Sequence, residues 1–197
     1  MQVKKDRRSN ADRTEAMRAK LLDVARDLFI THGYMETSTP QIVTAAKVTR
    51  GALYHHFDDK QALFRAVVER EAARLADTIE KRAPEAVSAA INLLAGADAY
   101  FDAMKEPGRA RLMLVDGPAV LGPKEMGRIF ASKGEEELRL GLAAVFGGET
   151  ELPLAALSAV VGASFDRAAL AIADGEDEAA FRQALTLLLS ALIEKKR

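Results

Sequence analysis

The 197-residue sequence contains no cysteine, which excludes a disulfide framework and a thiolate metal site and fits a reducing compartment. Its longest apolar runs, such as 142–146 and 168–173, are far shorter than the ~18 residues that a membrane span needs. The charged segment 1–8 is not followed by the apolar stretch of a secretory signal. We therefore predict a soluble, cytoplasmic chain without a membrane partner.

Motifs of catalysis are also missing from the sequence. It has no glycine-rich phosphate loop, no nucleophile elbow, no zinc-binding helix motif and no carboxylate pair on a scaffold that could hold it. His55 and His56 are adjacent, so they face different sides of a helix and cannot form the i, i+4 pair of a helical metal site. We predict no enzyme, no metal and no cofactor.

Charge is unevenly distributed, although the formal net charge is only −1. Residues 1–60 carry 11 Lys and Arg against 8 Asp and Glu, whereas residues 61–197 carry 17 against 21. This asymmetry indicates that a polyanion is met by the N-terminal third. The slight acidity of the whole chain argues against sequence-independent DNA packaging, which depends on many phosphate contacts. The basic arm 1–8 is either a solubilising tail or a segment that reaches the minor groove.

Runs of β-branched residues are scarce, and apolar residues recur at spacings of three and four, which predicts an all-α fold. Glycines and prolines divide the pattern into about nine helices. We expect these near 12–31, 38–46, 50–57, 58–82, 85–105, 108–115, 124–146, 154–173 and 177–195. The predicted organisation is a DNA-binding domain over 1–58, with the basic arm, and a helical ligand-binding and dimerisation domain over 59–197.

The helices expected near 38–46 and 50–57 are short and are joined by a three-residue turn that ends in Thr49. Ser38 and Gln41 fit a capping box, and Thr49 can cap the helix that follows. Two short helices braced by a longer first helix are the layout of a helix-turn-helix DNA reader. The same layout can also arise in an alanine-rich bundle that binds no DNA.

The second short helix has two chemically different faces. Hydrogen-bond donors occupy one face, and Gly51 keeps the helix N-terminus slim enough to approach DNA closely. The donors are Arg50, Tyr54, His55 and His56, and the residues expected to lock the helix against its neighbours are Ile42, Val48, Leu53 and Phe57. Tyr54 could be a core aromatic, but a phosphate contact is the preferred reading.

Residues 37–60, TSTPQIVTAAKVTRGALYHHFDDK, resemble the signature of the TetR family of transcriptional regulators. The detailed resemblance extends over about residues 13–63. The matching positions are Phe29, Gly33-Tyr34, Ile42, Ala46, Val48, Gly51-Ala52-Leu53-Tyr54, His56-Phe57, Lys60 and Leu63. The resemblance implies a homodimeric repressor that a small-molecule effector releases from a palindromic DNA operator. The alternative is a regulator controlled by a protein partner.

The same resemblance implies a set of DNA-binding residues. These are Thr39, Gln41, Thr49, Arg50, Gly51, Tyr54, His55, His56 and Lys60. The chain departs from the family at Lys47, where glycine is usual. A positive φ there would cost a residue with a side chain about 1–2 kcal/mol. We expect either a reshaped turn or an additional phosphate contact from Lys47.

The last two predicted helices are apolar on several faces, so they must be covered on several sides. We predict that they form half of a symmetric four-helix dimer interface, with a plain hydrophobic core as the alternative. The interface residues predicted are Leu157, Val161, Phe165, Phe181, Leu185, Leu188 and Leu192.

The middle region, 84–148, holds methionines and aromatics that can line an apolar cavity for an effector of unspecified identity. The candidate ligand-binding residues are Tyr100, Phe101, Met104, Met113, Met126 and Phe130, with core packing as the alternative. Five charged residues interrupt apolar helical patterns: Asp98, Asp102, Asp116, Asp166 and Arg167. They line a pocket, or they belong to solvated faces, turns or interface ion pairs.

Overall fold

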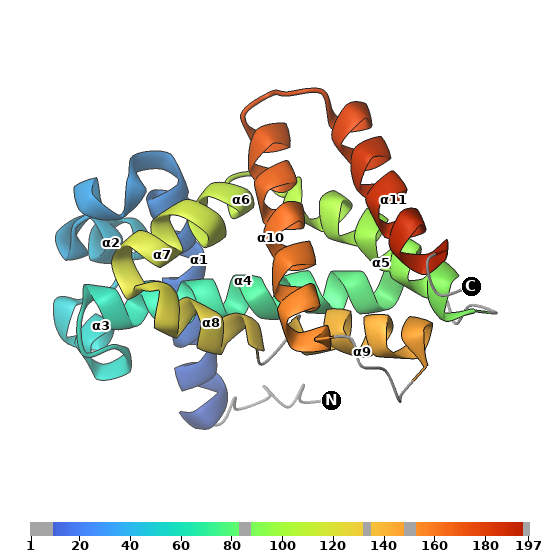
Figure 1. The fold of residues 1–197 in the computed structure, drawn as a ribbon. Helices are drawn as coiled ribbons and strands as arrows, with labels where there is room; N and C mark the ends of the chain where they lie inside the picture. The colour runs from blue at the N-terminus through green and yellow to red at the C-terminus, as the bar shows by residue number, and fades with distance from the viewer. Residues whose placement is uncertain (1–9, 83–87, 132–134, 148–152, 195–197) are drawn as a thin grey trace, which may run out of the picture. The chain divides into compact units, whose positions relative to one another are not determined.

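The computed structural model describes residues 10–82, 88–131, 135–147 and 153–194, and these residues are helical with no strand among them (Figure 1). The all-α prediction is therefore confirmed. The chain divides into two units, residues 1–67 and 68–197. The predicted boundary lies at 58/59, whereas the first unit ends at Val67 and thus includes the start of the fourth helix. The arm 1–8 lies outside the described residues.

The N-terminal unit contains α1 (Asn10–Glu36), α2 (Thr39–Ala46), α3 (Arg50–His56) and the beginning of α4 (Lys60–Arg82). Gly33 interrupts α1 with φ 77° and ψ 167°, close to the end predicted for this helix. Apolar side chains from all four helices form the core of this unit. They are Leu21, Leu22, Ala25, Phe29, Ile42, Ala46, Leu53, Phe57, Leu63, Phe64 and Val67.

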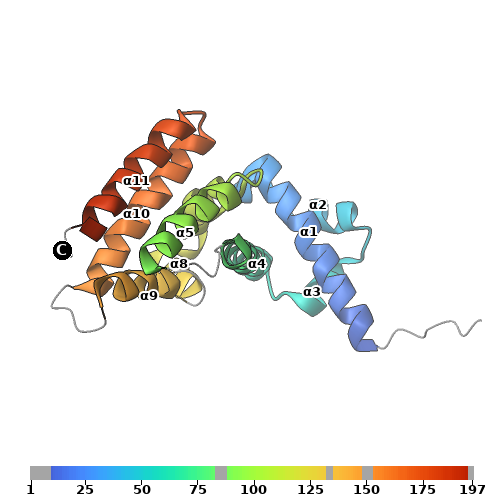
Figure 2. The same cartoon turned by 90° about the vertical axis from the view of Figure 1, so that its right-hand side faces the viewer.

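The C-terminal unit continues α4 and adds a series of further helices. These are α5 (Ala89–Met104), α6 (Arg109–Arg111), the π-helical turn η1 (Leu112–Asp116), α7 (Gly117–Leu121), α8 (Pro123–Ala131), α9 (Glu135–Phe146), α10 (Leu154–Ala173) and α11 (Glu178–Glu194). Both views show α10 and α11 side by side, with α5 packed against them (Figures 1 and 2). By length and hydropathy, α10 could span a membrane, a property shared with core helices of soluble proteins.

Two sequence-based boundaries were wrong in this unit. The segment around Gly117 and Pro118 was expected to be a non-helical break between two helices, but it begins α7 directly after η1. Proline is tolerated there because first-turn N–H groups have no partner within the helix. A Cβ on Gly117 would lie 2.9 Å from the Met126 side chain, so close packing explains this glycine. The single helix expected over 124–146 is instead α8 and α9, on either side of residues 132–134, which lie outside the description.

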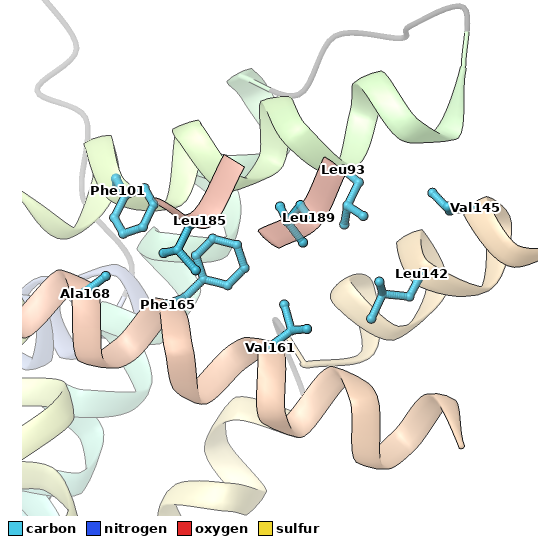
Figure 3. Packing of buried hydrophobic residues seen from close by; sticks show 9 residues of the cluster. All are labelled: Leu93, Phe101, Leu142, Val145, Val161, Phe165, Ala168, Leu185 and Leu189. Carbon is cyan, nitrogen blue, oxygen red and sulfur yellow. The ribbon is translucent and has the colours of Figure 1, made fainter. Parts of the chain in front are cut away.

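The core of the C-terminal unit gathers side chains from α5, α9, α10 and α11 (Figure 3). Phe101, Phe165 and Leu185 point toward one another, and the rings of Phe101 and Phe165 are 5.6 Å apart. Aromatic packing of this kind adds to the stabilisation from apolar burial. One continuous core thus holds α5, α9, α10 and α11 together.

A buried ion pair joins α4 to α6 within the same unit. Arg109 Nε donates to Glu71 Oε2 at 3.0 Å, and the Arg109 Nη1 group donates to the Ala103 carbonyl at 2.6 Å. The side chains of Glu71 and Arg109 are 0% and 8% exposed. On the solvent side, Arg74 Nη1 donates to Glu71 Oε1 at 3.1 Å. Sequence analysis did not predict this pair, because its partners lie 38 residues apart on separate helices.

Candidate nucleic-acid interface and apolar cavity

The side chains of α3 form a buried face that packs against the unit and an exposed polar face. Leu53 is fully buried and Phe57 nearly so, whereas Arg50, Gly51 and Tyr54 on the other face are exposed. His55 is exposed as well and His56 is half-buried, with ring centroids 5.4 Å apart. Among the described residues 10–67, Arg50, Tyr54 and His55 thus lie exposed on α3, with His56 partly exposed beside them.

Capping residues fix where α3 begins. Thr49 is its N-cap, and its hydroxyl oxygen accepts a hydrogen bond from the Ala52 N–H at 3.1 Å. The hydroxyl hydrogen of Thr49 remains a donor toward an acceptor outside the helix. A Cβ added to Gly51 would meet only Thr49 Oγ1, at 3.9 Å, which is an ordinary contact. The fold itself therefore does not require glycine at position 51.

Tyr54 connects the two short helices. A hydrogen bond with Thr39 of α2, and after it one with Arg50, lowers the pKa of the Tyr54 phenol. The Arg50 guanidinium carbon lies 5.4 Å from the centre of the Tyr54 ring. These contacts set the direction of both side chains before any partner arrives, which reduces the entropy lost on binding.

The start of α2 has the capping box predicted from the sequence. Ser38 N–H and Ser38 Oγ donate to Gln41 Oε1 at 2.7 and 2.8 Å, and the Gln41 N–H donates to Ser38 Oγ at 3.4 Å. The carboxamide oxygen of Gln41 is thus engaged inside the cap. Its NH₂ group is the part of this side chain that can reach a phosphate oxygen.

The turn between α2 and α3 keeps the conformation for which glycine is suited, although Lys47 occupies it. Lys47 has φ 53° and ψ 50°, and its N–H donates to the Thr44 carbonyl at 3.1 Å. The next N–H, of Val48, donates to the Val43 carbonyl at 3.0 Å. Of the two expectations, a reshaped turn is therefore wrong, and the exposed ammonium group of Lys47 stays a candidate phosphate contact.

Lys60 was predicted to bind phosphate, and the structure gives it an additional task. Its ammonium donates to the carbonyls of Tyr34 and Thr37 at 2.9 and 3.0 Å, and it lies 4.1 Å from the centre of the Tyr34 ring. An ammonium has three N–H donors, so one is left for a phosphate. Lys60 thus ties the start of α4 to the segment that precedes α2, which is a role that the sequence pattern did not reveal.

An apolar cavity of about 470 Å³ lies within the C-terminal unit, between α4, α5, α8, α9 and α10. Of the six candidate ligand-binding residues, Tyr100 and Phe130 line it. The other four, Phe101, Met104, Met113 and Met126, do not, and each is at most 4% exposed because it fills the core instead. Small residues create much of the space, and these are Ala72, Ala76, Gly96, Ala97, Gly127, Gly141, Ala159, Gly162 and Ala163.

The interface residues predicted on α10 and α11 mostly face inward. Val161, Phe165 and Leu185 belong to the buried core, and Phe165 also lines the cavity. Leu157, Phe181 and Leu192 pack against that core and are half-buried, while Leu188 is exposed. The exposed apolar residues of these helices that do not line the cavity are Ala155, Ala156, Val160, Ala173, Ala179, Ala180, Ala184, Leu187, Leu188 and Ala191. We call this set the alanine-rich face.

The five charged residues that interrupt the apolar pattern have different roles. Asp98 and Asp102 pair with Arg182 of α11, Asp116 lies 4.0 Å from Arg111, and Arg167 pairs with Glu176. Asp166 alone among the five lines the cavity. The sequence pattern marked all five equally, because it could not show which helix faces each carboxylate.

The short helices, their turn and the exposed donors on α3 define a helix-turn-helix DNA-binding protein. Comparison with known proteins agrees at both ends of the chain. Residues 21–67 match the family of bacterial regulatory proteins called the tetR family, and residues 90–195, more than half of the chain, match a Tetracyclin repressor-like C-terminal domain. The chain belongs to the TetR family, which is made up of transcriptional regulators.

Individual relatives show how far the similarity extends. A TetR-family transcriptional regulator from Pectobacterium atrosepticum is 32% identical, with 94% of this chain and 95% of that chain covered and a TM-score of 0.69. The transcriptional repressor AcnR of Corynebacterium efficiens is 36% identical over 73 residues, 37% of this chain and 39% of that protein. The transcriptional activator FasR of Mycolicibacterium smegmatis is 25% identical over 60% of this chain and 54% of that protein. The chain thus spans about two fifths of the length of AcnR.

Proposed function

We propose that this chain is a cytoplasmic, homodimeric transcriptional repressor that binds a palindromic DNA operator through α3 and releases it when a small molecule fills the cavity. The observation that carries the proposal is the exposed polar face of α3 beside Gly51, next to a fully buried Leu53. Such a helix, fixed on one side and free on the other, is suited to the major groove.

In this proposal, Arg50 and His55 contact base edges, while Tyr54 and the amide of Gln41 contact phosphates. Thr39, Lys47, Thr49, His56 and Lys60 complete the proposed contact surface. Arginine is the commonest reader of guanine, because its two donors match the two acceptors on the major-groove edge. The engaged oxygen of Gln41 favours a phosphate over an adenine edge, since adenine reading needs the carboxamide oxygen as an acceptor.

Dimerisation supplies the second half of the operator contact. The alanine-rich face leaves Val160 69% and Leu187 63% exposed, and an apolar surface of this kind is typical of an association site. A two-fold interface presents the same surface from both copies, so α10 and α11 of two chains would form a four-helix arrangement. The two α3 helices would then read half-sites about 34–36 Å apart.

Release would follow from a preference of the effector for an arrangement that does not fit the operator. The cavity is lined by Ala72, Leu75, Ala76 and Ile79 of α4, and α4 begins at Lys60 in the N-terminal unit. A ligand against these residues therefore contacts the helix that continues into the DNA-binding unit. By linkage, operator DNA must weaken the ligand by the same factor as the ligand weakens DNA binding.

The proposal is tested by selecting duplexes from a random pool with the full chain. We expect an inverted repeat, and gel shifts on it with Arg50→Ala should show a loss of about 1–3 kcal/mol in binding free energy. Lys124→Ala removes an exposed positive charge from α8 and serves as the matched control. Equal affinity of the folded Arg50→Ala variant and the wild type would refute the assignment of α3 as the reading helix.

A further inference from the structure

The cavity of the C-terminal unit carries charge of one sign. Its lining includes the carboxylates of Asp166 and Glu137, and none of the residues described around it is lysine, arginine or histidine. The remaining polar lining residues are Tyr100, Asn92 and Ser158. Most of the wall is apolar, so the carboxylate of Asp166 dominates the electrostatic potential that a ligand beside it would meet.

Asp166 is half-buried beside the aromatic part of this wall. The Tyr100 hydroxyl donates to Asp166 Oδ1 at 2.6 Å, and the Tyr100 ring packs 5.6 Å from the ring of Phe165. Burial raises the pKa of Asp166, an effect that the hydrogen bond from Tyr100 opposes. The adjacent Arg167 does not serve as a counter-ion, because it pairs with Glu176 at 3.4 Å.

A carboxylate in apolar surroundings is unfavourable unless it has a partner of opposite charge. Tyr100 contributes one neutral hydrogen bond, and no ion pair to Asp166 is found within the part of the chain that the structure describes. Ser158, the other buried polar group of the wall, is satisfied locally by donating to the Ala155 carbonyl at 3.1 Å. Asp166 is therefore the group in this cavity that a positively charged ligand would stabilise.

We propose that the cavity binds a lipophilic cation, an amine or quaternary ammonium compound, with its positive charge against Asp166 and its apolar body along the small residues of α5 and α10. This inference rests on the proposed function, since it names the chemical class of the effector. Tyr100, Phe130 and Phe165 add ring faces that attract a cation.

The same charges exclude anionic ligands of equal size. A carboxylate ligand would place a second negative charge near Asp166 without a basic residue to balance it, and specificity often depends on such repulsion. Apolar burial alone would favour acids, alcohols and ammonium compounds of one chain length about equally. A cavity that selects cations should therefore discriminate between head groups, whereas a purely apolar cavity should not.

The experiment measures direct binding of decyltrimethylammonium, decanol and decanoate to the full-length protein by calorimetry. We expect the ammonium compound to bind about ten-fold or more tighter than decanol, since the attraction between its positive charge and the Asp166 carboxylate adds to the apolar burial that both compounds share. Decanoate should bind most weakly. Tighter or equal binding of decanoate, or no binding by any of the three, would overturn the proposal. This order is read on the unsubstituted protein, so it does not depend on how any variant folds.

Two substitutions test whether Asp166 is the source of the preference for ammonium over decanol. Asp166→Asn keeps the shape of the side chain and an acceptor for Tyr100, and it should abolish the preference for ammonium over decanol. Asp174→Asn removes a carboxylate from the exposed end of the same helix and should leave the preference unchanged. An ammonium preference that persists in folded Asp166→Asn would place the cation elsewhere.

Gel shifts on the selected operator separate the two proposals. If the ammonium compound binds with the expected order but leaves operator affinity unchanged, the cavity assignment holds and release by a cavity ligand fails. If decanoate releases the operator and the ammonium compound does not, the repressor mechanism holds and the charge assignment fails.

Discussion

Replacing Lys47 by glycine is expected to stabilise the helix-turn-helix and to weaken its binding to DNA. Lys47 ends α2 in the left-handed region, with φ 53° and ψ 50°, and it is the one residue other than glycine with positive φ in the part of the chain that the structure describes. Its side chain is exposed beside the N-terminus of α3. The substitution therefore changes a backbone energy and a surface charge together.

The size of the stability effect follows from two opposing contributions. A residue with a side chain costs about 1–2 kcal/mol in the left-handed region. Glycine removes that cost but gives the unfolded chain more conformational freedom, which offsets about 0.5–1 kcal/mol of the gain. We expect a net increase of about 0.5–1 kcal/mol in the free energy of unfolding, or a rise of about 1–4 °C in Tm if the whole chain unfolds together.

Lys47→Ala separates the two effects, because alanine keeps a Cβ in the left-handed region and loses the charge. Chemical denaturation should show stabilisation for Lys47→Gly but not for Lys47→Ala. Gel shifts over a series of salt concentrations should show weaker binding for both, with the salt slope reduced by about 0.9 for the lost phosphate contact. Equal stability of the two variants would refute the strain argument, and an unchanged slope would remove Lys47 from the DNA contacts.

Four further predictions test other parts of the structure. Gly51→Ala should raise the free energy of unfolding by about 0.5–1 kcal/mol, because a helical alanine fits there with its nearest contact at 3.9 Å. The same substitution should lower operator affinity in gel shifts, because its methyl group would stand between α3 and the DNA. Unchanged affinity would argue against close approach of DNA at this position. Glu71→Gln should lower the free energy of unfolding, measured in urea, by about 3 kcal/mol, since it leaves the buried Arg109 without its carboxylate. Glu69→Gln, near the exposed Arg128, should have little effect. Similar losses in both variants would contradict the importance of burial. Leu187→Glu should give folded monomers in light scattering, while Val161→Glu should unfold the chain, and a dimeric Leu187→Glu protein would place the interface elsewhere. Because burial raises the pKa of Asp166, its ionisation opposes folding, so the wild type should lose stability relative to Asp166→Asn as pH rises through that pKa; parallel curves of Tm against pH would contradict this.

The helix-turn-helix could be predicted closely because its signals are local. The capping box of Ser38 and Gln41, the cap at Thr49 and the buried Leu53 all act within a few residues of one another. The positive φ at Lys47 could be anticipated from the resemblance, because the family usually has glycine at this position. The structural role of Lys60 could not be predicted from the sequence, because its hydrogen-bond partners at positions 34 and 37 depend on how the helices pack.

The cavity could not be predicted in the same way, because a cavity forms where side chains are small. Large apolar residues of the middle region, such as Met113 and Met126, predict a cavity wall as readily as a core, and in the structure they fill the core. The signal that could have found the wall was the helical spacing of small residues, such as Ala159, Gly162 and Ala163 at positions i, i+3 and i+4 of α10. On α10 and α11, both faces are apolar, so hydropathy alone could not tell the core side of Val161 from the exposed side of Val160.

The alanine-rich face has a consequence for the entropy of association. Long side chains lose rotamer freedom when a partner covers them, at about 0.5–1.5 kcal/mol each, whereas alanine has no rotamers to lose. Seven of the residues in this set are alanines, and Val160 is already restricted at χ1 by its branched Cβ. A second copy that covers this face would therefore restrict few new degrees of freedom. Alanine also favours the helix before any contact forms, so the surface that associates is ordered in advance.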